Sequence, residues 1–366
     1  MAKKRKTQKR SGGFVANAIL IFLCVIWMIP IVGVLITSVR QSSQIFNSGW
    51  WTVFPHKELV NIGEITIDDS VDVDSPITVN GITATFEQWR EGIQTDDDQV
   101  ITWYGNKRTR KLTVSEEQWK GFSTDLTLKN YRDVISGKTI TYKDAQGNTI
   151  TRQGNNLGSA FLNSLAVSIP GTIIPILIAA FAAYGFAWLK FPGSNFFFSI
   201  IVALLVVPLQ VALVPILSDY VKLGLNGTFL GIWLAHTGFG LPLATYLLFN
   251  YISTLPRDLL ESAFIDGASN FTIFTQLVLP LSVPALASFA IFQFLWLWND
   301  YLVALIFLNE KNRVLTFALA SLVGEKGQDW HLMTAAAFVS MIVPLMVFLL
   351  LQRYFVRGLM AGSVKG

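Results

Sequence analysis

The sequence predicts an all-α polytopic membrane protein with six transmembrane helices and one β-rich insert in water. Of its 366 residues, 52% are hydrophobic and only 14% are charged, whereas an average soluble domain is roughly 25% charged. Sixteen of the 24 acidic residues lie between Gln41 and Gly158. Outside that block the chain contains uncharged apolar runs of about 18 residues or more, the length that a bilayer span requires.

The first predicted span covers residues 14–39 and follows a basic N-terminus at residues 1–13. Six of the 28 basic residues lie in the first ten positions, and basic residues favour the cytoplasmic side of a membrane. The run exceeds the roughly 7–15 apolar residues of a signal peptide, so we expect a retained anchor. The single cysteine, Cys24, lies inside this run and supports neither a disulfide framework nor a cysteine-based metal site.

The second feature is the insert at residues 40–158, which we expect to be extracytoplasmic and β-rich from about residue 57 to residue 154. Residues 63–86 alternate β-branched and polar side chains, a pattern typical of strands. Asn80-Gly81 within this stretch predicts a hairpin turn.

An acidic sequence, DDSVDVD, begins at Asp68 within the insert. It lacks the glycine and the distal glutamate of an EF-hand loop. We interpret it as a solvated acidic face, and we predict no metal site.

Five further apolar runs predict the remaining spans, at residues 160–189, 195–217, 229–251, 277–308 and 333–355. Six spans return the tail at residues 356–366 to the cytoplasmic side, where Arg357 lies and no acidic residue follows Asp329. The connection at residues 309–331 is then extracytoplasmic. Prolines inside several spans predict bent helices.

Polar side chains inside the predicted spans are candidates for a transport pathway, because each costs free energy in hydrocarbon. Spacings of three and four place Gln293, Trp296 and Asp300 on one helix face, where an aromatic ring beside hydrogen-bonding groups suits a sugar. Asn163 and His236 are further candidates. The alternative is hydrogen bonding between packed helices, with the tryptophans forming an interfacial belt.

The cytoplasmic segment at residues 253–276 is much longer than a turn between two spans requires. Leu259, Leu260, Ala263 and Phe264 recur at helical spacing, which predicts one shared face, and Gly267 stands where such a helix would end. Arg257 is outnumbered by nearby acidic residues, whereas helices on membrane surfaces are rich in Lys and Arg. We therefore favour docking in a protein groove over a helix on the lipid surface.

This segment resembles the EAA-x3-G-x9-I-x-L-P loop of ABC importer permeases. Glu261-Ser262-Ala263, Gly267 and Leu277-x-Leu279-Pro280 carry the resemblance, with Ser262 and Leu277 as mild departures. The sequences LTLKNY from Leu126 and FLNS from Phe161, and the C-terminal ending, resemble the carbohydrate, MalG-type branch. Residues 208–308 are most similar to alpha-glucoside permeases.

The resemblance implies a permease subunit of an ATP-driven, binding-protein-dependent sugar importer in the bacterial inner membrane, multi-pass, with both termini cytoplasmic. Its implied partners are a second homologous permease, two ABC ATPase subunits and an extracytoplasmic sugar-binding protein. ATP and Mg would be bound by the ATPase subunits, since this chain lacks a G-x-x-x-x-G-K-[ST] phosphate loop. We expect no catalytic residue, no cofactor and no nucleic acid partner.

Two sets of contacts follow from the same resemblance. The implied binding-protein contacts lie in the loop at residues 309–331 and are Gly324, Gly327 and Trp330. The implied ATPase-coupling residues are Glu261, Ser262, Ala263, Asp266, Gly267, Leu279 and Pro280.

Two other classes of function compete with this interpretation. A secondary transporter would need ion-coupling charges within the membrane and commonly an inverted repeat, and Asp300 is the only charge placed to serve. A membrane-anchored receptor or structural protein could work through the insert, but it leaves residues 253–276 unexplained. Copurification of an ATPase subunit would favour the importer alone.

Overall fold

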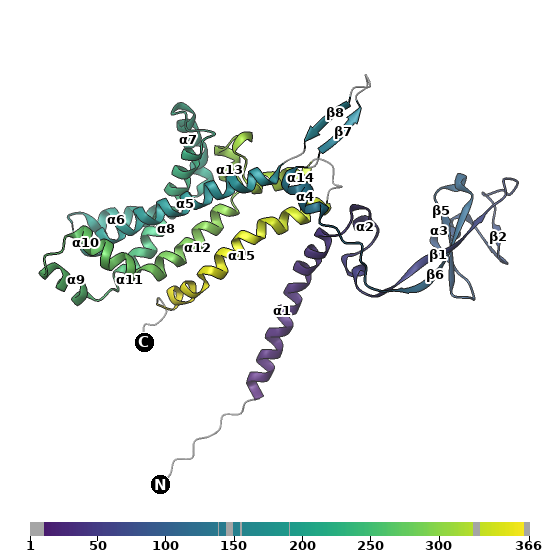
Figure 1. The fold of residues 1–366 in the computed structure, drawn as a ribbon, viewed down its shortest axis with the longest axis horizontal. Coiled ribbons are helices and arrows are strands. Elements are labelled where there is room, and N and C mark those ends of the chain that lie inside the picture. The colour runs from purple at the N-terminus through teal and green to yellow at the C-terminus, as the bar shows by residue number, and fades with distance from the viewer. Residues whose placement is uncertain are drawn as a thin grey trace, which may run out of the picture. The chain divides into compact units, whose positions relative to one another are not determined.

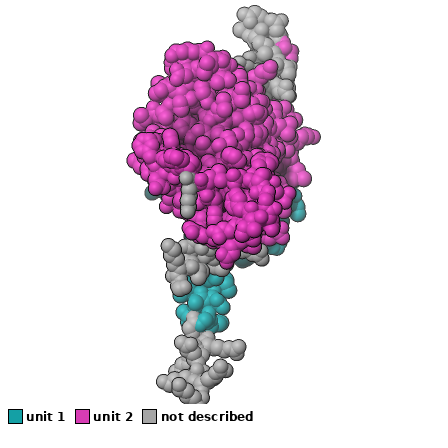
Figure 2. Space-filling view, turned by 90° about the vertical axis from the view of Figure 1, so that its left-hand side faces the viewer, with its two compact units in different colours: residues 1–127 teal, residues 128–366 magenta. Residues whose placement is uncertain are grey.

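A computed structural model describes residues 11–137, 139–143, 149–153, 156–189, 191–324 and 330–361. The chain divides into two compact units, residues 1–127 and residues 128–366, which are coloured separately in Figure 2. Each unit is described by itself.

The first unit begins with α1 (Ser11–Ser38), a long apolar helix. The most apolar part of its candidate span, Gly13–Ser38, has a mean hydropathy of 3.1 and is only 6% buried. Two short helices follow, α2 (Ser42–Asn47) and η1 (Trp50–Val53). A helix this apolar and this exposed needs lipid or another chain to cover it.

The rest of the first unit is a small antiparallel β domain. Its four-stranded sheet has the order β1-β6-β5-β4, and its core includes Trp89, Ile101 and Leu112, all fully buried. The strands are β1 (His56–Thr66), β4 (Ile93–Gln94), β5 (Gln99–Tyr104) and β6 (Lys111–Lys120); the short helices are α3 (Phe86–Glu91) and η2 (Lys107–Thr109).

A separate hairpin joins β2 (Ile77–Val79) to β3 (Ile82–Ala84). Asn80 and Gly81 both have positive φ, 49° and 82°, as a type I′ turn requires. This confirms the hairpin that Asn80-Gly81 predicts.

The second unit contains α4 (Lys129–Ser136), a hairpin of β7 (Thr139–Lys143) and β8 (Thr149–Gln153), and a helix bundle. The insert expected as one block is therefore divided, since its last two strands belong with the helices. The bundle helices are α5 (Leu157–Tyr184, extended by the π-helical turn η3, Gly185–Leu189), α6 (Ser194–Leu204), α7 (Leu209–Lys222), α8 (Phe229–Ile252), α9 (Arg257–Ile265), α10 (Asn270–Ile273), η4 (Phe274–Val278), α11 (Leu279–Leu281), α12 (Val283–Trp298), α13 (Leu302–Phe307), η5 (Glu310–Asn312), α14 (Leu315–Gly324) and α15 (Trp330–Ala361).

Four helices of the described chain are long and apolar enough to cross a membrane, and two bent helix pairs raise the number to as many as six. Residues 195–217, expected as one span, form α6 and α7, which meet at 100°. Pro208 lies at this break. The residue before a proline is disfavoured in the α conformation, which favours a break in the helix at this position.

The expected span at residues 277–308 is also broken. Asn270–Leu281 and Val283–Trp298 meet at 72°, and α12 ends at Trp298. Asp300 therefore does not continue the helix face of Gln293 and Trp296, although spacing alone places all three together.

In the second unit α5, α8, α12 and α15 run side by side (Figure 1). At one end of this bundle lie α9, α10 and α11, together with the C-terminal ends of α5, α8 and α15. At the other end lie α14 and α4, whereas α7 and α13 project from the side of the bundle (Figure 1). The long connection between α8 and α12 and the connection between α12 and α15 therefore occupy opposite ends of the bundle.

Candidate functional site

The segment that resembles a coupling loop is built around α9, which ends in a defined cap. Gly267 has φ +80°; its N–H donates to Phe264 O at 3.1 Å, and the N–H of Ala268 donates to Ala263 O at 3.0 Å. These two bonds form a Schellman motif, in which a glycine supplies the left-handed conformation. The motif fixes the direction in which the chain leaves α9.

One face of this segment is packed into the bundle. Leu260, Ile273 and Val278 are each at most 1% exposed. Their cluster includes α5, α8 and α12 side chains, namely Ala179, Ala180, Ala183, Tyr184, Ala244, Leu248, Ile252 and Phe289. The segment is therefore packed directly against three helices of the bundle.

The segment also exposes four apolar side chains among exposed polar ones. Ile265 is 86% exposed, Phe271 68%, Leu259 47% and Phe264 44%. Helical spacing predicts Leu259 and Phe264 on the same face as Leu260, but the structure turns them outward. Exposed apolar patches rimmed by polar groups mark sites of protein contact, so we call these four side chains the coupling patch.

The structure brings most of the expected coupling residues to this segment's surface. Glu261, Ser262, Asp266 and Gly267 lie on α9 and its cap, and all four are exposed. Ala263 and Leu279 are half-buried against the bundle. Pro280 is exposed on α11, just before the 72° bend.

Three of the five candidate pathway residues, His236, Trp296 and Asp300, meet within the bundle. His236 on α8 is fully buried, and its Nε2 lies 3.7 Å from Asp300 Oδ2. Its ring meets Trp296 edge-on, with the centroids 5.3 Å apart. Neither ring nitrogen of His236 has a hydrogen-bond partner among the described residues.

Asp300 lies two residues before α13. Its carboxylate accepts hydrogen bonds from the backbone N–H groups of Val303 at 3.2 Å and Ala304 at 2.9 Å. A side-chain acceptor at a helix start satisfies backbone donors that otherwise lack partners. Asp300 therefore links the start of α13 to the buried imidazole on α8.

Gln293 is 3% exposed on α12, and its Nε2 donates to Gly171 O on α5 at 3.3 Å. A Cβ at Gly240 would lie 2.6 Å from Gln293 Nε2, and a Cβ at Gly171 would lie 2.4 Å from Leu297 Cδ2. These two glycines let α5 and α8 approach α12 closely. Neither glycine is among the residues predicted from the sequence, although an isolated glycine inside an apolar helix is a signal of close packing.

Gln293 and Trp296 also line a cavity of about 650 Å³. The bend between α6 and α7 forms one wall, and α8 and α12 form the others. Its other lining residues are Leu204, Leu205, Val207, Leu209, Ala212, Ile216, Tyr220, Leu234, Ala235, Gly238, Phe239, Gly240, Pro242 and Leu243. The volume falls in the range of small-molecule sites, roughly 300–1,000 Å³.

Asn163 lies apart from this cluster. Its Nδ2 donates to Arg313 O at 3.0 Å, and the neighbouring Ser164 Oγ accepts from Leu315 N at 2.8 Å. Together these bonds anchor the start of α14 to α5. Asn163 therefore helps to hold the chain that leads into α14 against α5.

The expected binding-protein loop is largely helical. Leu315 and Ala318 of α14 are each 1% exposed and pack into the bundle. Gly324 ends α14, and Trp330, which is 47% exposed, begins α15. Gly327 lies outside the described residues.

Within the described part of the chain, no group of three or more His, Cys, Asp or Glu side chains is arranged to hold a metal ion.

Comparison with known proteins identifies the relatives of this chain. A family profile described as a binding-protein-dependent transport system inner membrane component matches residues 171–360. The osmoprotective compounds uptake permease protein GgtD of Synechocystis sp. is 45% identical over 93% of this chain and 88% of its own length. The alpha-glucoside transport system permease protein AglG of Rhizobium meliloti is 42% identical over 94% of this chain and 95% of its own length.

The fold also matches a solved structure. A bacterial ABC transporter involved in the import of the acidic polysaccharide alginate contains a chain that superposes with a TM-score of 0.60. The match covers 97% of this chain and 100% of that chain at 15% identity. At this identity the likeness concerns the fold alone.

Proposed function

Because this chain belongs to the family of binding-protein-dependent transport system inner membrane components, we propose that it forms one half of the sugar pathway of an ATP-driven importer. The chain is a multi-pass inner membrane permease of a binding-protein-dependent ABC transporter complex, and it is not itself an enzyme. Membership excludes the secondary transporter and the anchored receptor as alternatives. The substrate, the remaining partners and the coupling residues are parts of the proposal.

The proposed substrates are alpha-glucosides and related neutral osmoprotective sugars. Two full-length relatives are named for alpha-glucosides and for osmoprotective compounds. The cavity lined by Gln293 and Trp296 has room for a small sugar, and the indole offers it an apolar face. His236 and Asp300 lie behind this wall and hold Trp296 and α13 in place.

The proposed partners are a second permease, two ABC ATPase subunits and the binding protein. The exposed α1 suits a second membrane chain, because 6% burial leaves nearly all its surface to be covered. ATP and Mg belong to the ATPase subunits in this proposal. The binding protein would contact the region around Gly324, Gly327 and Trp330.

The proposed ATPase contact is supported mainly by one observation: the coupling patch lies on a segment that is itself packed into the bundle. Ile265 and Phe271 project an apolar surface outward, while Leu260 and Val278 fix the same segment to α5, α8 and α12. A helix docked in a groove of the ATPase would pass its movement to those helices. Glu261 and Asp266 at the edge of the patch would orient the contact.

We further propose six spans, with α1, the four long bundle passes and the bent α6–α7 pair crossing the bilayer. The ends of α5, α8 and α15 and the coupling patch share one end of the bundle (Figure 1), which supports a cytoplasmic C-terminus beside the ATPase. Six spans place the N-terminus on the same side, as its basic residues favour. The β domain is then extracytoplasmic.

Rebinding of the purified ATPase to stripped membrane vesicles tests docking and orientation together. We expect binding to inside-out vesicles and none to right-side-out vesicles. Ile265→Asp should weaken rebinding by at least roughly tenfold, because a charge would be buried in the groove. Leu223→Asp is the matched control, since Leu223 is 70% exposed and precedes the start of α8, whose other end leads into α9.

Two results would contradict the proposal. One is rebinding to right-side-out vesicles, which would reverse the orientation. The other is wild-type rebinding by Ile265→Asp, which would remove the coupling patch from the ATPase contact.

A further inference from the structure

The first unit contains a polar pocket at the neck of the β domain, where the chain enters and leaves the sheet. Residues 40–58 and residues 120–126 run together there, closed by the β-bridge between Arg40 and Leu126 and by a bond from Ser123 N to Val53 O at 3.0 Å. The pocket has a volume of about 560 Å³, and we call it the neck pocket. Its lining residues are Arg40, Ser43, Gln44, Asn47, Ser48, Thr52, Val53, His56, Glu58, Lys120, Gly121, Phe122, Ser123, Thr124 and Asp125.

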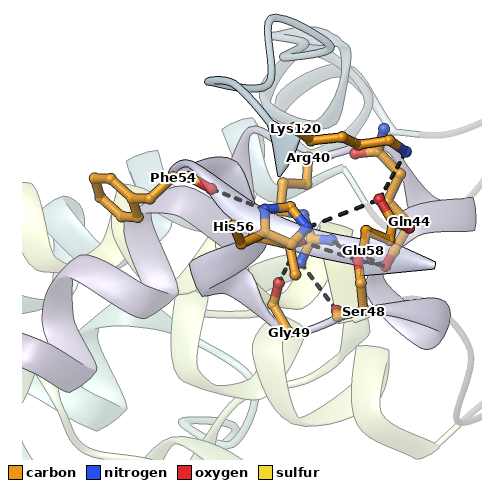
Figure 3. A network of polar contacts seen from close by, with 9 residues as sticks. Arg40, Gln44, Ser48, Gly49, Phe54, His56, Glu58 and Lys120 are labelled. Atoms are coloured by element: carbon orange, nitrogen blue, oxygen red, sulfur yellow. Dashed lines mark hydrogen bonds and ion pairs between the residues drawn. The ribbon is translucent and has the colours of Figure 1, made fainter. Parts of the chain in front are cut away.

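The polar groups of the neck pocket are held in place (Figure 3). Arg40 is 3% exposed, and its guanidinium donates to Gln44 O at 3.0 Å, Ser48 O at 3.2 Å and Ser48 Oγ at 2.6 Å. A cation at the end of α2 satisfies carbonyls that the helix leaves unpaired. The short helix is thereby fixed as one wall of the pocket.

The opposite wall comes from the first pair of the β1–β6 ladder and its neighbours. Lys120 Nζ lies 2.6 Å from Glu58 Oε2, and His56 Nε2 lies 3.8 Å from the same carboxylate oxygen. The Lys120 ammonium lowers the pKa of Glu58 below its ordinary value. His56 Nδ1 lies 2.8 Å from Phe54 O, which orients the ring (Figure 3).

The charges and hydrogen-bonding groups that line the neck pocket indicate which class of ligand it could bind. The pocket's two cations, Arg40 and Lys120, are balanced by two carboxylates, Glu58 and Asp125, so the lining suits neither an anion nor a cation. Hydroxyl and amide side chains supply both donors and acceptors. Phe122 is 68% exposed at the rim and offers an apolar face for the C–H side of a sugar ring.

We propose that the neck pocket binds a neutral saccharide, forming a sugar site separate from the transport pathway. The identification of the ligand as a sugar rests on the proposed function, whereas the pocket's charge balance and mixed donors and acceptors stand independently. Residues of the first unit alone build the site. It therefore places substrate recognition on the β domain as well as on the helix bundle.

The test measures saccharide binding by saturation-transfer NMR, using the assembled importer in nanodiscs without its binding protein. Sucrose, trehalose and maltose are the probes, and inorganic phosphate is the anionic competitor. We expect Asn47→Leu and Phe122→Ala each to weaken binding roughly tenfold. The matched controls Gln41→Leu and Phe46→Ala, which change exposed side chains outside the pocket lining, should bind as wild type.

Gln293→Leu separates this site from the pathway, and it should leave neck binding unchanged. The inference is overturned if the wild type binds none of the three sugars, if both neck variants bind as wild type, or if phosphate displaces the sugar at equal concentration. ATP-driven sugar uptake by the same preparation would show that the proposed function survives such a result. Neck binding without any uptake would instead count against the proposed function and leave the neck site standing.

Discussion

Gln293 shows how a single side chain joins packing to the proposed pathway. Its amide bonds to Gly171 O while the same residue lines the cavity between α7, α8 and α12. Trp296 lines the same cavity and contacts the buried His236. A change at Gln293 therefore alters both the cavity wall and the contact between α5 and α12.

Gln293→Leu keeps a similar volume but removes the amide. We expect sugar uptake to fall by roughly threefold to tenfold, the effect of losing about one hydrogen bond, with ATPase rebinding unchanged. Uptake in proteoliposomes is the measurement, and Gln352→Leu, an exposed amide near the end of α15, is the control. Unchanged uptake in Gln293→Leu would remove the cavity from the pathway.

Sequence reasoning at the residue scale found the polar side chains but not all of their partners. His236, Trp296 and Asp300 do meet, yet they do so because α12 ends at Trp298 and the chain turns back toward α8. Helical spacing cannot reveal such an ending. The bond from Asn163 to Arg313 O joins positions 150 residues apart, which no local pattern encodes.

At the scale of elements, α9 is stabilised by its cap and by the bundle beneath it. Gly267 has φ +80°, and a Cβ added at this position would meet no atom within 4 Å, so a substitution there strains the backbone alone. The position therefore isolates the direction of the chain from the packing of side chains.

Gly267→Val should uncouple the importer. A β-branched residue in the left-handed region costs roughly 1–2 kcal/mol, enough to shift α9 out of its docked direction in most molecules. We expect ATP hydrolysis to continue while the sugar transported per ATP falls about fivefold or more. Gly267→Asn, which tolerates this conformation, should retain coupling.

Equal loss of coupling in both Gly267 variants would show that the backbone conformation is not the cause. Wild-type coupling in Gly267→Val would show that the capped end of α9 carries no movement.

Turn residues in the sequence predict some elements of the fold, whereas elements that depend on packing cannot be predicted from them. Asn80-Gly81 predicted its hairpin and Gly267 its helix end, because both positions require positive φ. Pro208 marked a bend, but its 100° angle depends on packing of α6 and α7 that sequence does not specify. The neck pocket could not be predicted from the sequence, because its walls come from segments about 60 residues apart along the chain. The Lys57–Glu117 pair of the same ladder has this separation.

For the whole molecule, the two units contain different parts of the proposed importer subunit. The second unit contains the helix bundle, the coupling patch and the cavity, and the family match at residues 171–360 lies entirely within it. The first unit contributes α1, which needs a covering partner, and the β domain with its neck pocket. The complete pathway is therefore a property of the assembled importer.

In the proposed mechanism, ATP hydrolysis in partner subunits moves sugar through a pathway that this chain half encloses. ATP-driven uptake of labelled maltose or sucrose tests it directly, in proteoliposomes that contain the purified complex and its binding protein. We predict uptake that requires ATP and the binding protein together and that falls about tenfold with Ile265→Asp. Uptake that persists without ATP, or that is unaffected by Ile265→Asp in the fully assembled complex, would rule out this mechanism.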